Sequence, residues 1–223
     1  MKKKVFIDGS EGTTGLLPDA AAREAVAMVE NENTIILDTS TAHRTEAGWA
    51  YGYPELSAAH REAIRTGKRI AVPGCYATGF ITTAYALVAG GILPKDYPVS
   101  AFAVSGYSGG GKKMIAQYQA QDKEKELSSA RLYALSQSHK HLKEMKAISG
   151  LERTPLFSPM VTDYYSGMTV SLTFYADMLN GRQTPETVRE YLAKHYAGEK
   201  FITVQPLGAE AESGGVLFSS ARS

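Results

Sequence analysis

Short apolar runs alternate with longer helix-prone segments over the first part of the chain. The apolar runs, each followed closely by a polar residue, proline or glycine, are residues 5–7, 34–37 and 69–72. The segments rich in alanine, charged residues and other helix formers are residues 18–30, 57–66 and 76–88. Strands that alternate with helices favour a parallel α/β sheet, in which residues 4–38 form one βαβ-like unit.

The pattern changes after Pro94, where the strand-like segments become longer and the crossovers fewer. The expected strands are residues 99–105, 169–175 and 201–204, and the expected helices are residues 114–135 and 185–195. The glycine-rich stretch 106–111 is expected to be a loop between them. This order favours an α+β second domain, so we divide the chain into residues 1–95 and 96–223.

Composition narrows the classes of protein that fit. The chain has 223 residues, with 24 Lys and Arg against 23 Asp and Glu, so its net charge of +1 gives no bulk attraction to nucleic acid or an anionic membrane. Its single cysteine excludes an intrachain disulfide and suits a reducing compartment. The apolar run that ends at Asp8 is only three residues long, and no apolar run reaches the length of a membrane span. We therefore expect a cytoplasmic, globular protein.

Three glycines, Gly9, Gly12 and Gly15, lie between the first expected strand and the first expected helix. Glycine lets the backbone approach a pyrophosphate, and a following helix presents free N–H groups and the positive end of its dipole. The spacing differs from the common G-x-G-x-x-G, so a tight strand–helix turn is the alternative. The pattern predicts a phosphate-binding loop.

Cys75 lies between an expected strand and an expected helix, directly after Pro73 and Gly74. A thiol at the N-terminus of a helix has a lowered pKa and a larger thiolate fraction. A lone cysteine is otherwise most often a small buried apolar residue. The position at the start of a helix favours the other interpretation, so we predict that Cys75 is a nucleophile.

Two histidines, His139 and His141, lie two residues apart in Ser138-His-Lys-His141 and are expected to point in different directions. Either imidazole suits the proton transfer that thiol chemistry needs. A metal site would require further Cys or His residues at ligand spacing, which the sequence does not offer, so we expect no metal. A solvated helix end is the remaining alternative.

Two polar loops carry cations that suit anionic ligands. Arg44 follows the second expected strand, and a guanidinium can grip a carboxylate or phosphate through paired hydrogen bonds. The loop of residues 106–113 combines open backbone with two lysines, which suits an anion such as phosphate. The alternatives are a solvated arginine and a flexible connection. The apolar and aromatic segment 155–167 is expected to pack against a neighbouring element or a second subunit.

Taken together, these segments resemble the N-acetyl-gamma-glutamyl-phosphate reductases, specifically the shorter of that family's two sequence types. The matching stretches, which follow the family's order, are residues 5–16, 17–22, 38–45, 53–56, 73–79, 106–112, 138–141 and 155–168. They extend over nearly the whole chain. Each match alone is modest evidence for the family, whereas eight matches in the same order are specific for it. The resemblance implies a glyceraldehyde-dehydrogenase-like architecture, with a Rossmann-like domain and an α+β domain for substrate binding and oligomerisation.

The same resemblance implies an enzyme of arginine biosynthesis that uses NADP. It would reduce N-acetylglutamyl 5-phosphate to N-acetylglutamate 5-semialdehyde with release of phosphate. Cys75 would attack the acyl phosphate and form a thioester, and His139 or His141 would transfer the proton. The remaining residues that the resemblance assigns are Gly9, Gly12, Thr13, Thr14 and Gly15 for the cofactor, Arg44 for the substrate carboxylate, and Ser108, Gly109 and Lys112 for the phosphate side. A homo-oligomer, dimer or tetramer, is implied, without nucleic acid or membrane partners.

The sequence departs from the family pattern in two places. Gly15 runs directly into residues 17–22, which the family carries in a later loop, beyond another strand. Too few residues separate Gly15 from Ile35 for more than one helix, since a βαβ unit takes roughly 30 residues. The missing stretch would include the position that reads the cofactor ribose. The family also continues past Ser223 through more strand and a glycine-rich helix. Both departures fall on the nucleotide-binding half, so we expect NADP affinity to suffer.

Two alternatives therefore stay open beside a working reductase. The first is a cofactor-impaired relative that acts as an oligomerising or thiol-bearing protein. The second is an enzyme like aspartate-semialdehyde dehydrogenase, which shares the Gly-x-x-Gly-x-x-Gly opening and the cysteine mechanism. That class usually has Gln-Asn-Cys at the nucleophile, whereas this chain has Pro73-Gly74-Cys75.

Overall fold

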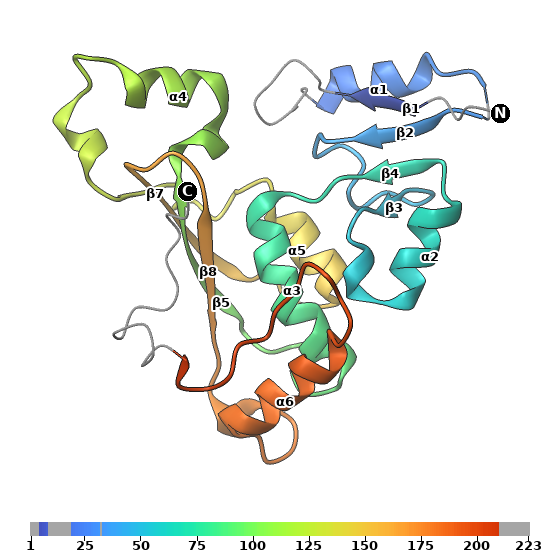
Figure 1. The fold of residues 1–223 in the computed structure, drawn as a ribbon, viewed down its shortest axis with the longest axis vertical. Helices are drawn as coiled ribbons and strands as arrows, with labels where there is room; N and C mark the ends of the chain where they lie inside the picture. Colours follow the sequence, from blue (N-terminus) through green and yellow to red (C-terminus); the bar gives the residue numbers. More distant parts are fainter. Residues whose placement is uncertain (1–4, 9–18, 32, 210–223) are drawn as a thin grey trace. The chain divides into compact units, whose positions relative to one another are not determined.

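The computed structural model describes the backbone of residues 5–8 and the whole of residues 19–31 and 33–209. The chain forms two compact units, Met1–Thr78 and Gly79–Ser223, and helix α3 (Cys75–Ala89) continues from one into the other (Figure 1). The functional boundary that the sequence places between residues 95 and 96 lies beyond the end of this helix and stays a prediction.

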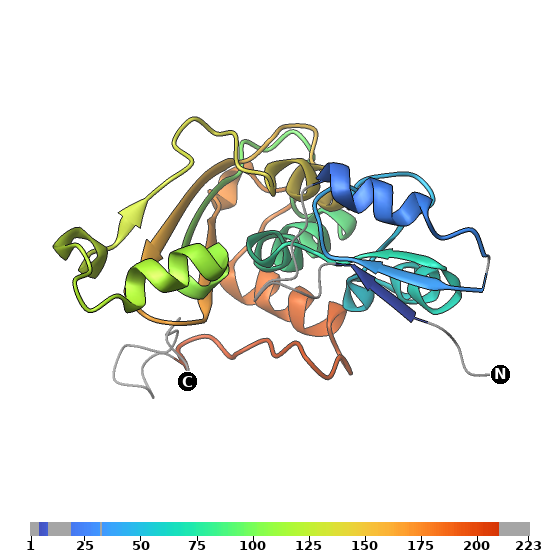
Figure 2. The ribbon, with the colours of Figure 1, turned by 90° about the horizontal axis from the view of Figure 1, so that it is seen from above.

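The first unit is built on a four-stranded parallel sheet. Its strands, in spatial order, are β1 (Val5–Asp8), β2 (Ile35–Asp38), β4 (Arg69–Ala71) and β3 (Ala50–Tyr51). Helix α1 (Asp19–Ala27) connects β1 to β2 and lies along one side of the strands (Figure 2). The short helix η1 (Pro54–Leu56) and helix α2 (Ala58–Thr66) precede β4. The predicted parallel sheet and its βαβ unit are confirmed.

Local signals explain where α2 begins and ends. The Ser57 hydroxyl accepts a hydrogen bond from the backbone N–H of His60, 3.3 Å away, which satisfies one of the free donors of the first turn. The Gly67 N–H donates to the Ala63 carbonyl and closes the helix. A Cβ at Gly67 would lie 2.5 Å from that carbonyl oxygen, so a side chain does not fit. The expected helix 57–66 is therefore confirmed.

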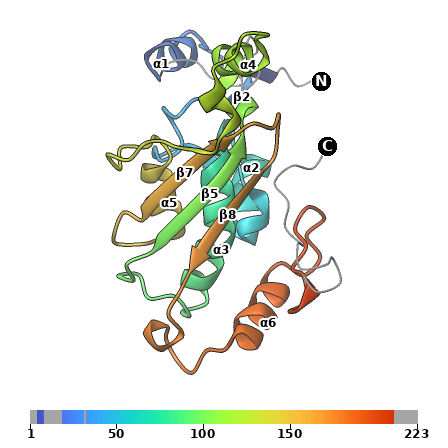
Figure 3. The ribbon, with the colours of Figure 1, turned by 90° about the vertical axis from the view of Figure 1, so that its left-hand side faces the viewer.

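The second unit is built on a four-stranded mixed sheet (Figure 3). Its strands, in spatial order, are β6 (Arg131–Leu132), β7 (Leu156–Thr162), β5 (Ser100–Gly106) and β8 (Met168–Thr173). β5 and β7 are parallel, whereas β8 and β6 join them antiparallel. The helices are α3, α4 (Gly111–Gln119), α5 (Leu142–Ser149) and α6 (Pro185–His195), with short helices η2 (Tyr107–Gly110), η3 (Lys125–Ser128) and η4 (Ala176–Met178). The expected α+β character is confirmed.

The two faces of this sheet differ in exposure. Ala101, Ala103 and Phe157 point to the same face and are almost fully buried. Helix α3 packs on β8 so closely that a Cβ at Gly79 would lie 2.7 Å from Cγ2 of Val170. The opposite face is open and carries the exposed Phe102 of β5 beside β7. The segment 155–167 contains β7, so its predicted packing against a neighbouring element is confirmed.

Two expected elements are wrong. The helix expected over residues 114–135 ends at Gln119, because Ala120 is extended and the chain turns back through η3 and β6. Tyr118 and Leu127 then pack in one cluster with Tyr107 and Val161, a tertiary contact that a continuous helix could not make. The strand expected over residues 201–204 is irregular, and Phe201 is exposed. None of the helices in the described ranges is long and apolar enough to cross a membrane.

Candidate active site

Cys75 is the first residue of α3 and its side chain is exposed. The Gly74 carbonyl accepts hydrogen bonds from the Thr78 N–H at 2.8 Å and from the Thr78 hydroxyl at 3.0 Å, which closes the first helical turn around the cysteine. Tyr76 and Ala77, which follow it, are buried and anchor that turn. The structure therefore presents this thiol at a helix N-terminus, in the position expected of a nucleophile.

The residues that precede Cys75 are fixed to neighbouring segments of the first unit. The Val72 N–H donates to the Asp38 carbonyl at 2.7 Å, and the Arg44 Nε donates to the Val72 carbonyl at 2.9 Å. The Gly52 N–H donates to the Ala71 carbonyl, and a Cβ at Gly52 would lie 2.9 Å from that oxygen. The turn that leads into α3 is therefore held from two sides.

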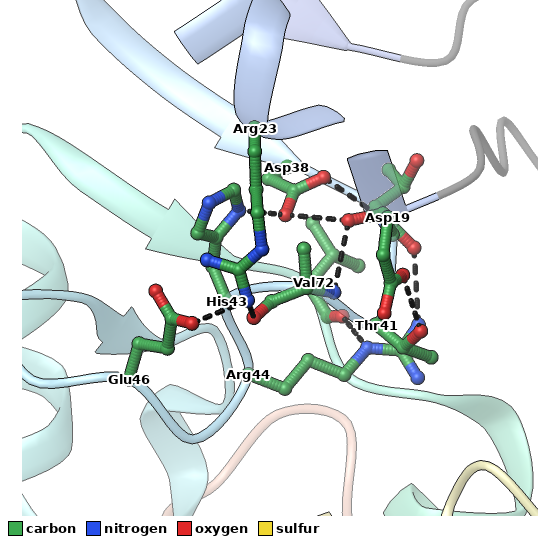
Figure 4. A network of polar contacts seen from close by, with 11 residues as sticks. Asp19, Arg23, Asp38, Thr41, His43, Arg44, Glu46 and Val72 are labelled. Carbon is green, nitrogen blue, oxygen red and sulfur yellow. Dashed lines mark hydrogen bonds and ion pairs between the residues drawn. The ribbon is translucent and has the colours of Figure 1, made fainter. Parts of the chain in front are cut away.

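A buried carboxylate organises the loop after β2 (Figure 4). Asp38 is 0% exposed, and its two oxygens accept from the Ser40 N–H and the Ser40 hydroxyl, both at 2.8 Å. Its Oδ2 also lies 2.6 Å from Nδ1 of His43. The His43 ring stacks on Trp49 with centroids 4.1 Å apart. A buried carboxylate needs such partners, and these contacts give the loop one defined conformation.

Helix α1 adds a second layer of contacts to the same loop. The Thr41 hydroxyl donates to Asp19 Oδ1 at 2.6 Å, and Arg23 donates to the Ala42 carbonyl at 2.9 Å. Arg23 also forms an ion pair with Glu46, which raises the pKa of the arginine through the hydrogen bond between them. The loop after β2 is thus bonded to α1 on its surface side and to Asp38 on its buried side (Figure 4).

Arg44 belongs to this buried network and is only 6% exposed. Its Nε donates to the Val72 carbonyl and its Nη2 donates to the Thr39 carbonyl at 3.0 Å. The predicted grip of Arg44 on a substrate carboxylate stays a prediction. The described contacts direct two of its nitrogens to backbone oxygens instead.

The predicted histidine pair forms a compact cluster before α5. The His139 and His141 rings lie 4.7 Å apart at 70°, so they are neighbours and not the diverging side chains that the spacing predicts. The reason is the turn between them, in which the backbone N–H of His141 donates to Nδ1 of His139 at 3.1 Å. His141 is buried and is the N-cap residue of α5, where its carbonyl accepts from the backbone N–H of Met145.

The environment of His139 keeps its ring neutral at pH 7. Burial, with a smaller contribution from the nearby Lys140 charge, lowers the pKa of His139 to about 4. The ring contacts Phe157 edge-on with centroids 5.2 Å apart. Because Nδ1 accepts a hydrogen bond from the His141 backbone, the proton of the neutral ring lies on Nε2. His139 is therefore arranged to donate a hydrogen bond from Nε2.

A groove of about 530 Å³ lies beside this cluster in the second unit. Ser138, His139, Lys143 and Lys146 contribute its polar lining, together with the amide of Gln137. That amide is already paired, since it both donates to and accepts from the backbone of Phe157. The charged side chains that line the groove are both lysines, so the groove favours anionic ligands.

The glycine-rich loop after β5 folds into η2 and the start of α4. Ser108 is half-buried and its N–H donates to the Tyr165 carbonyl, whereas Gly109 and Lys112 are exposed. Gly111 has φ of +78°, a conformation that favours glycine. Lys112 lies in the first turn of α4, a nine-residue helix, so its charge adds to the positive end of the dipole. The predicted role of this loop in binding an anion stays a prediction.

The structure places the predicted site residues in three groups. Cys75 and Arg44 belong to the first unit, and His139, His141, Ser108, Gly109 and Lys112 belong to the second. The predicted cofactor residues Gly9, Gly12, Thr13, Thr14 and Gly15 lie outside the described residues. Among the described residues, no three side chains of metal-ligating type gather in one place. The sequence missed Asp38 and Gly52, although a carboxylate at the end of a buried strand was the available signal for Asp38.

Comparison with known proteins decides the family. Residues 75–219 match the family model described as semialdehyde dehydrogenase, dimerisation domain. N-acetyl-gamma-glutamyl-phosphate reductase of Sinorhizobium fredii is 41% identical over 253 residues, which cover 94% of this chain and 82% of that protein. The chain belongs to the N-acetyl-gamma-glutamyl-phosphate reductase family. The alignment is longer than the 223-residue chain, so this relative of the family contains internal residues that the chain lacks.

Solved structures share the fold of this reductase family member at low sequence identity. Aspartate semialdehyde dehydrogenase II of Vibrio cholerae, in complex with ASA, has a TM-score of 0.61 and 11% identity over 87% of this chain and 80% of that one. Aspartate semialdehyde dehydrogenase of Candida albicans, solved with NADP, has a TM-score of 0.54 and 14% identity over 84% and 54%. At such identities the likeness shows the fold alone, a Rossmann-like sheet with a second α+β domain.

Proposed function

We propose that the chain catalyses the NADPH-dependent reduction of N-acetylglutamyl 5-phosphate to N-acetylglutamate 5-semialdehyde, with release of phosphate, in arginine biosynthesis. The observation that carries the proposal is an exposed Cys75 at the first residue of α3 in a member of this reductase family. A cytoplasmic enzyme fits this chemistry, because the nucleophile has to stay reduced.

Cys75 performs the covalent part of the reaction. Its sulfur attacks the acyl carbon of the substrate, the bond from that carbon to the phosphate oxygen breaks, and phosphate leaves as a thioester forms. The helix N-terminus stabilises the thiolate that attacks. A thioester carbonyl accepts hydride more readily than a carboxylate does, so the covalent step prepares the reduction.

The cofactor site is proposed at the edge of the first sheet. β1 and β2 are parallel neighbours, so their carboxyl ends share the edge at which dinucleotides bind in such sheets. The Gly9–Gly15 segment follows β1 directly and supplies Gly9, Gly12, Thr13, Thr14 and Gly15 to hold the pyrophosphate of NADP. NADPH, when bound there, supplies the hydride for the reduction.

The histidine pair handles the proton of the final step. An imidazole would give a proton to the oxyanion left by hydride addition, and would take it back from the resulting hydroxyl as the carbon–sulfur bond breaks and Cys75 leaves as a thiolate. His139 is neutral with its proton on Nε2, so it suits a hydrogen-bond donor to the substrate oxygen. We assign the proton transfer to His141 and the stabilising hydrogen bond to His139. Ser108, Gly109 and Lys112 would bind the phosphate side.

The nucleophile is tested by comparing the wild-type protein with Cys75→Ser in phosphate-dependent reduction of NADP by the semialdehyde. We expect Cys75→Ser to lose turnover while its circular dichroism and thermal unfolding stay unchanged. Near-normal turnover in Cys75→Ser would reject the assignment of the nucleophile.

A cofactor-impaired relative is the second candidate function. The observation that favours it is the alignment with the Sinorhizobium relative, which is longer than this chain and so implies internal residues that are absent here. Calorimetric titration with NADP and with NADPH separates the two candidates. Saturable micromolar binding supports the enzyme, whereas no binding by a protein whose Cys75 still alkylates rapidly at pH 7 supports the impaired relative.

We also propose that the open face of the second sheet forms a homo-oligomer contact. Phe102 is 43% exposed and Leu156 is 61% exposed on this face, and the match to a dimerisation domain includes both. Large apolar side chains that are exposed on an open sheet face are typical of a contact with a second subunit. Phe102→Lys should shift the protein to a monomer in sedimentation velocity, whereas Phe201→Lys, at an exposed residue outside the sheet, should not. An unchanged sedimentation coefficient in Phe102→Lys would reject this interface.

A further inference from the structure

The loop after β2 and the turn before α3 are connected through backbone atoms of Val72. Its N–H donates to the Asp38 carbonyl and its carbonyl accepts from Nε of Arg44. Val72 lies three residues before Cys75, so both of its hydrogen-bonding groups are held close to the point at which α3 begins. A displacement of the loop would therefore be transmitted to the turn that carries the sulfur.

The guanidinium of Arg44 joins two separate segments. Nε reaches Val72 in the turn before α3, and Nη2 reaches Thr39 in the loop after β2. A rigid planar fork can make both bonds at once, whereas a single ammonium group cannot match that geometry. Burial at 6% exposure keeps these bonds away from competing water.

The carboxylate of Asp38 holds the other end of the same loop. It is fully buried and bonded to Ser40 and His43, so the loop cannot shift without exposing or unpairing a charged group. Figure 4 shows Asp38, His43, Arg44 and Val72 in this one network. The loop after β2 therefore keeps one conformation, and the turn before α3 is hydrogen-bonded to it.

We propose that Arg44 is a positioning residue for Cys75, and that it acts through Val72 and not through the substrate. It sets the turn so that Cys75 opens α3 with its sulfur at the helix N-terminus. The inference rests on the proposed role of Cys75 as the nucleophile, and it replaces the carboxylate-binding role that the sequence predicts for Arg44.

The test uses the fact that Cys75 is the only cysteine of the chain, so thiol alkylation reports on this residue alone. The second-order rate constants for iodoacetamide, which is neutral, and for iodoacetate, which is a carboxylate, are measured at pH 7 for the wild-type protein, Arg44→Ala and Arg44→Lys. Arg65→Ala is the matched control, because Arg65 is an exposed arginine of the same unit that pairs with Glu62.

A positioning role predicts that Arg44→Ala slows both reagents by the same factor, about fivefold, because the thiolate loses part of its stabilisation by the helix N-terminus. Arg44→Lys should be slowed similarly despite its retained charge, and Arg65→Ala should match the wild-type protein. The ratio of the iodoacetate rate to the iodoacetamide rate should stay constant across all four proteins.

Two results would overturn the inference. A selective loss of the iodoacetate rate in Arg44→Ala, restored by Arg44→Lys, would make Arg44 an anion ligand beside the sulfur. Unchanged rates for both reagents would show that the turn does not depend on Arg44. If Arg44→Ala does not fold, Arg44→Lys decides the outcome: equal slowing of both reagents supports the inference, and unchanged rates overturn it. Alkylation needs neither substrate nor cofactor, so a failed proposal of reductase activity leaves this result interpretable.

Discussion

The neutral state of His139 makes the stability of the protein depend on pH in a defined direction. Burial lowers the pKa of His139 to about 4 from its ordinary value of 6.5, and Lys140 contributes a second, smaller lowering. The unfolded chain therefore takes up a proton at this histidine at a higher pH than the folded protein does. The contribution of His139 to the free energy of unfolding is complete above pH 6.5 and is lost as the pH falls from 6.5 to 4. Below pH 4 this contribution no longer changes with pH.

The size of the effect follows from the same numbers. A difference of one pKa unit corresponds to about 1.4 kcal/mol, so the lowering from 6.5 to about 4 gives about 3–4 kcal/mol as an upper limit. The ring is not fully buried, and solvent screens part of the interaction, so we expect about 2 kcal/mol. For a domain with a free energy of unfolding of about 5–15 kcal/mol, such a loss is readily measured.

The assay is urea unfolding at several pH values between 7.5 and 4, with the wild-type protein and His139→Gln. Glutamine keeps an oxygen that can accept from the His141 backbone but has no proton to take up. We expect the wild-type protein to lose about 2 kcal/mol more stability than His139→Gln over this range. NMR titration of the ring gives its pKa directly, and nitrogen chemical shifts identify the protonated atom.

His60 provides the matched control, because burial also lowers the pKa of this histidine. His60→Gln should still show the loss of unfolding free energy at low pH that protonation of His139 in the unfolded chain causes. A His139 ring that titrates near 6.5, or a His139→Gln protein with the same pH dependence as the wild type, would refute the reasoning. A ring protonated on Nδ1 would refute the assigned tautomer and with it the division of roles between His139 and His141.

Further predictions concern packing and helix capping. Gly79→Ala should lower the free energy of unfolding by about 1–3 kcal/mol, because its Cβ would meet Val170 in β8. Gly109→Ala is the control, since open space surrounds this position and its stability should not change. Equal melting temperatures of the two variants in differential scanning calorimetry would contradict this prediction. Thr184→Ala should cost about 1 kcal/mol, since the Thr184 hydroxyl accepts from the Thr187 N–H in a capping box. An unchanged midpoint of urea unfolding in Thr184→Ala would show that this cap does not stabilise α6.

Features that depend on neighbouring residues in the chain follow well from the sequence. The helix expected over residues 185–195 begins and ends as predicted, because Thr184 and Pro185 supply the start locally. The parallel order of β1 and β2 likewise follows from a strand, a helix and a strand in succession. The exposed position of Cys75 at a helix start was predictable from the Pro-Gly-Cys turn for the same reason.

Features that depend on distant segments could not be predicted in the same way. The helix expected through residue 135 stops at Gln119, because Tyr118 and Leu127 meet Tyr107 and Val161 only in the folded unit. Arg44 has a side chain of the type that binds anions, yet two of its nitrogens donate to the carbonyls of Thr39 and Val72. These two residues come together only when β2 pairs with β4. The role of an arginine is therefore decided by its burial and partners, which a single sequence does not contain.

Mass spectrometry of the covalent intermediate tests the proposed chemistry most directly. The intact protein is incubated with freshly prepared N-acetylglutamyl 5-phosphate without NADPH, and its mass is measured before and after hydroxylamine, which cleaves thioesters. The account predicts one added N-acetylglutamyl group on Cys75, released by hydroxylamine and absent from Cys75→Ser. An unmodified wild-type protein, or an equal adduct on Cys75→Ser, would contradict it.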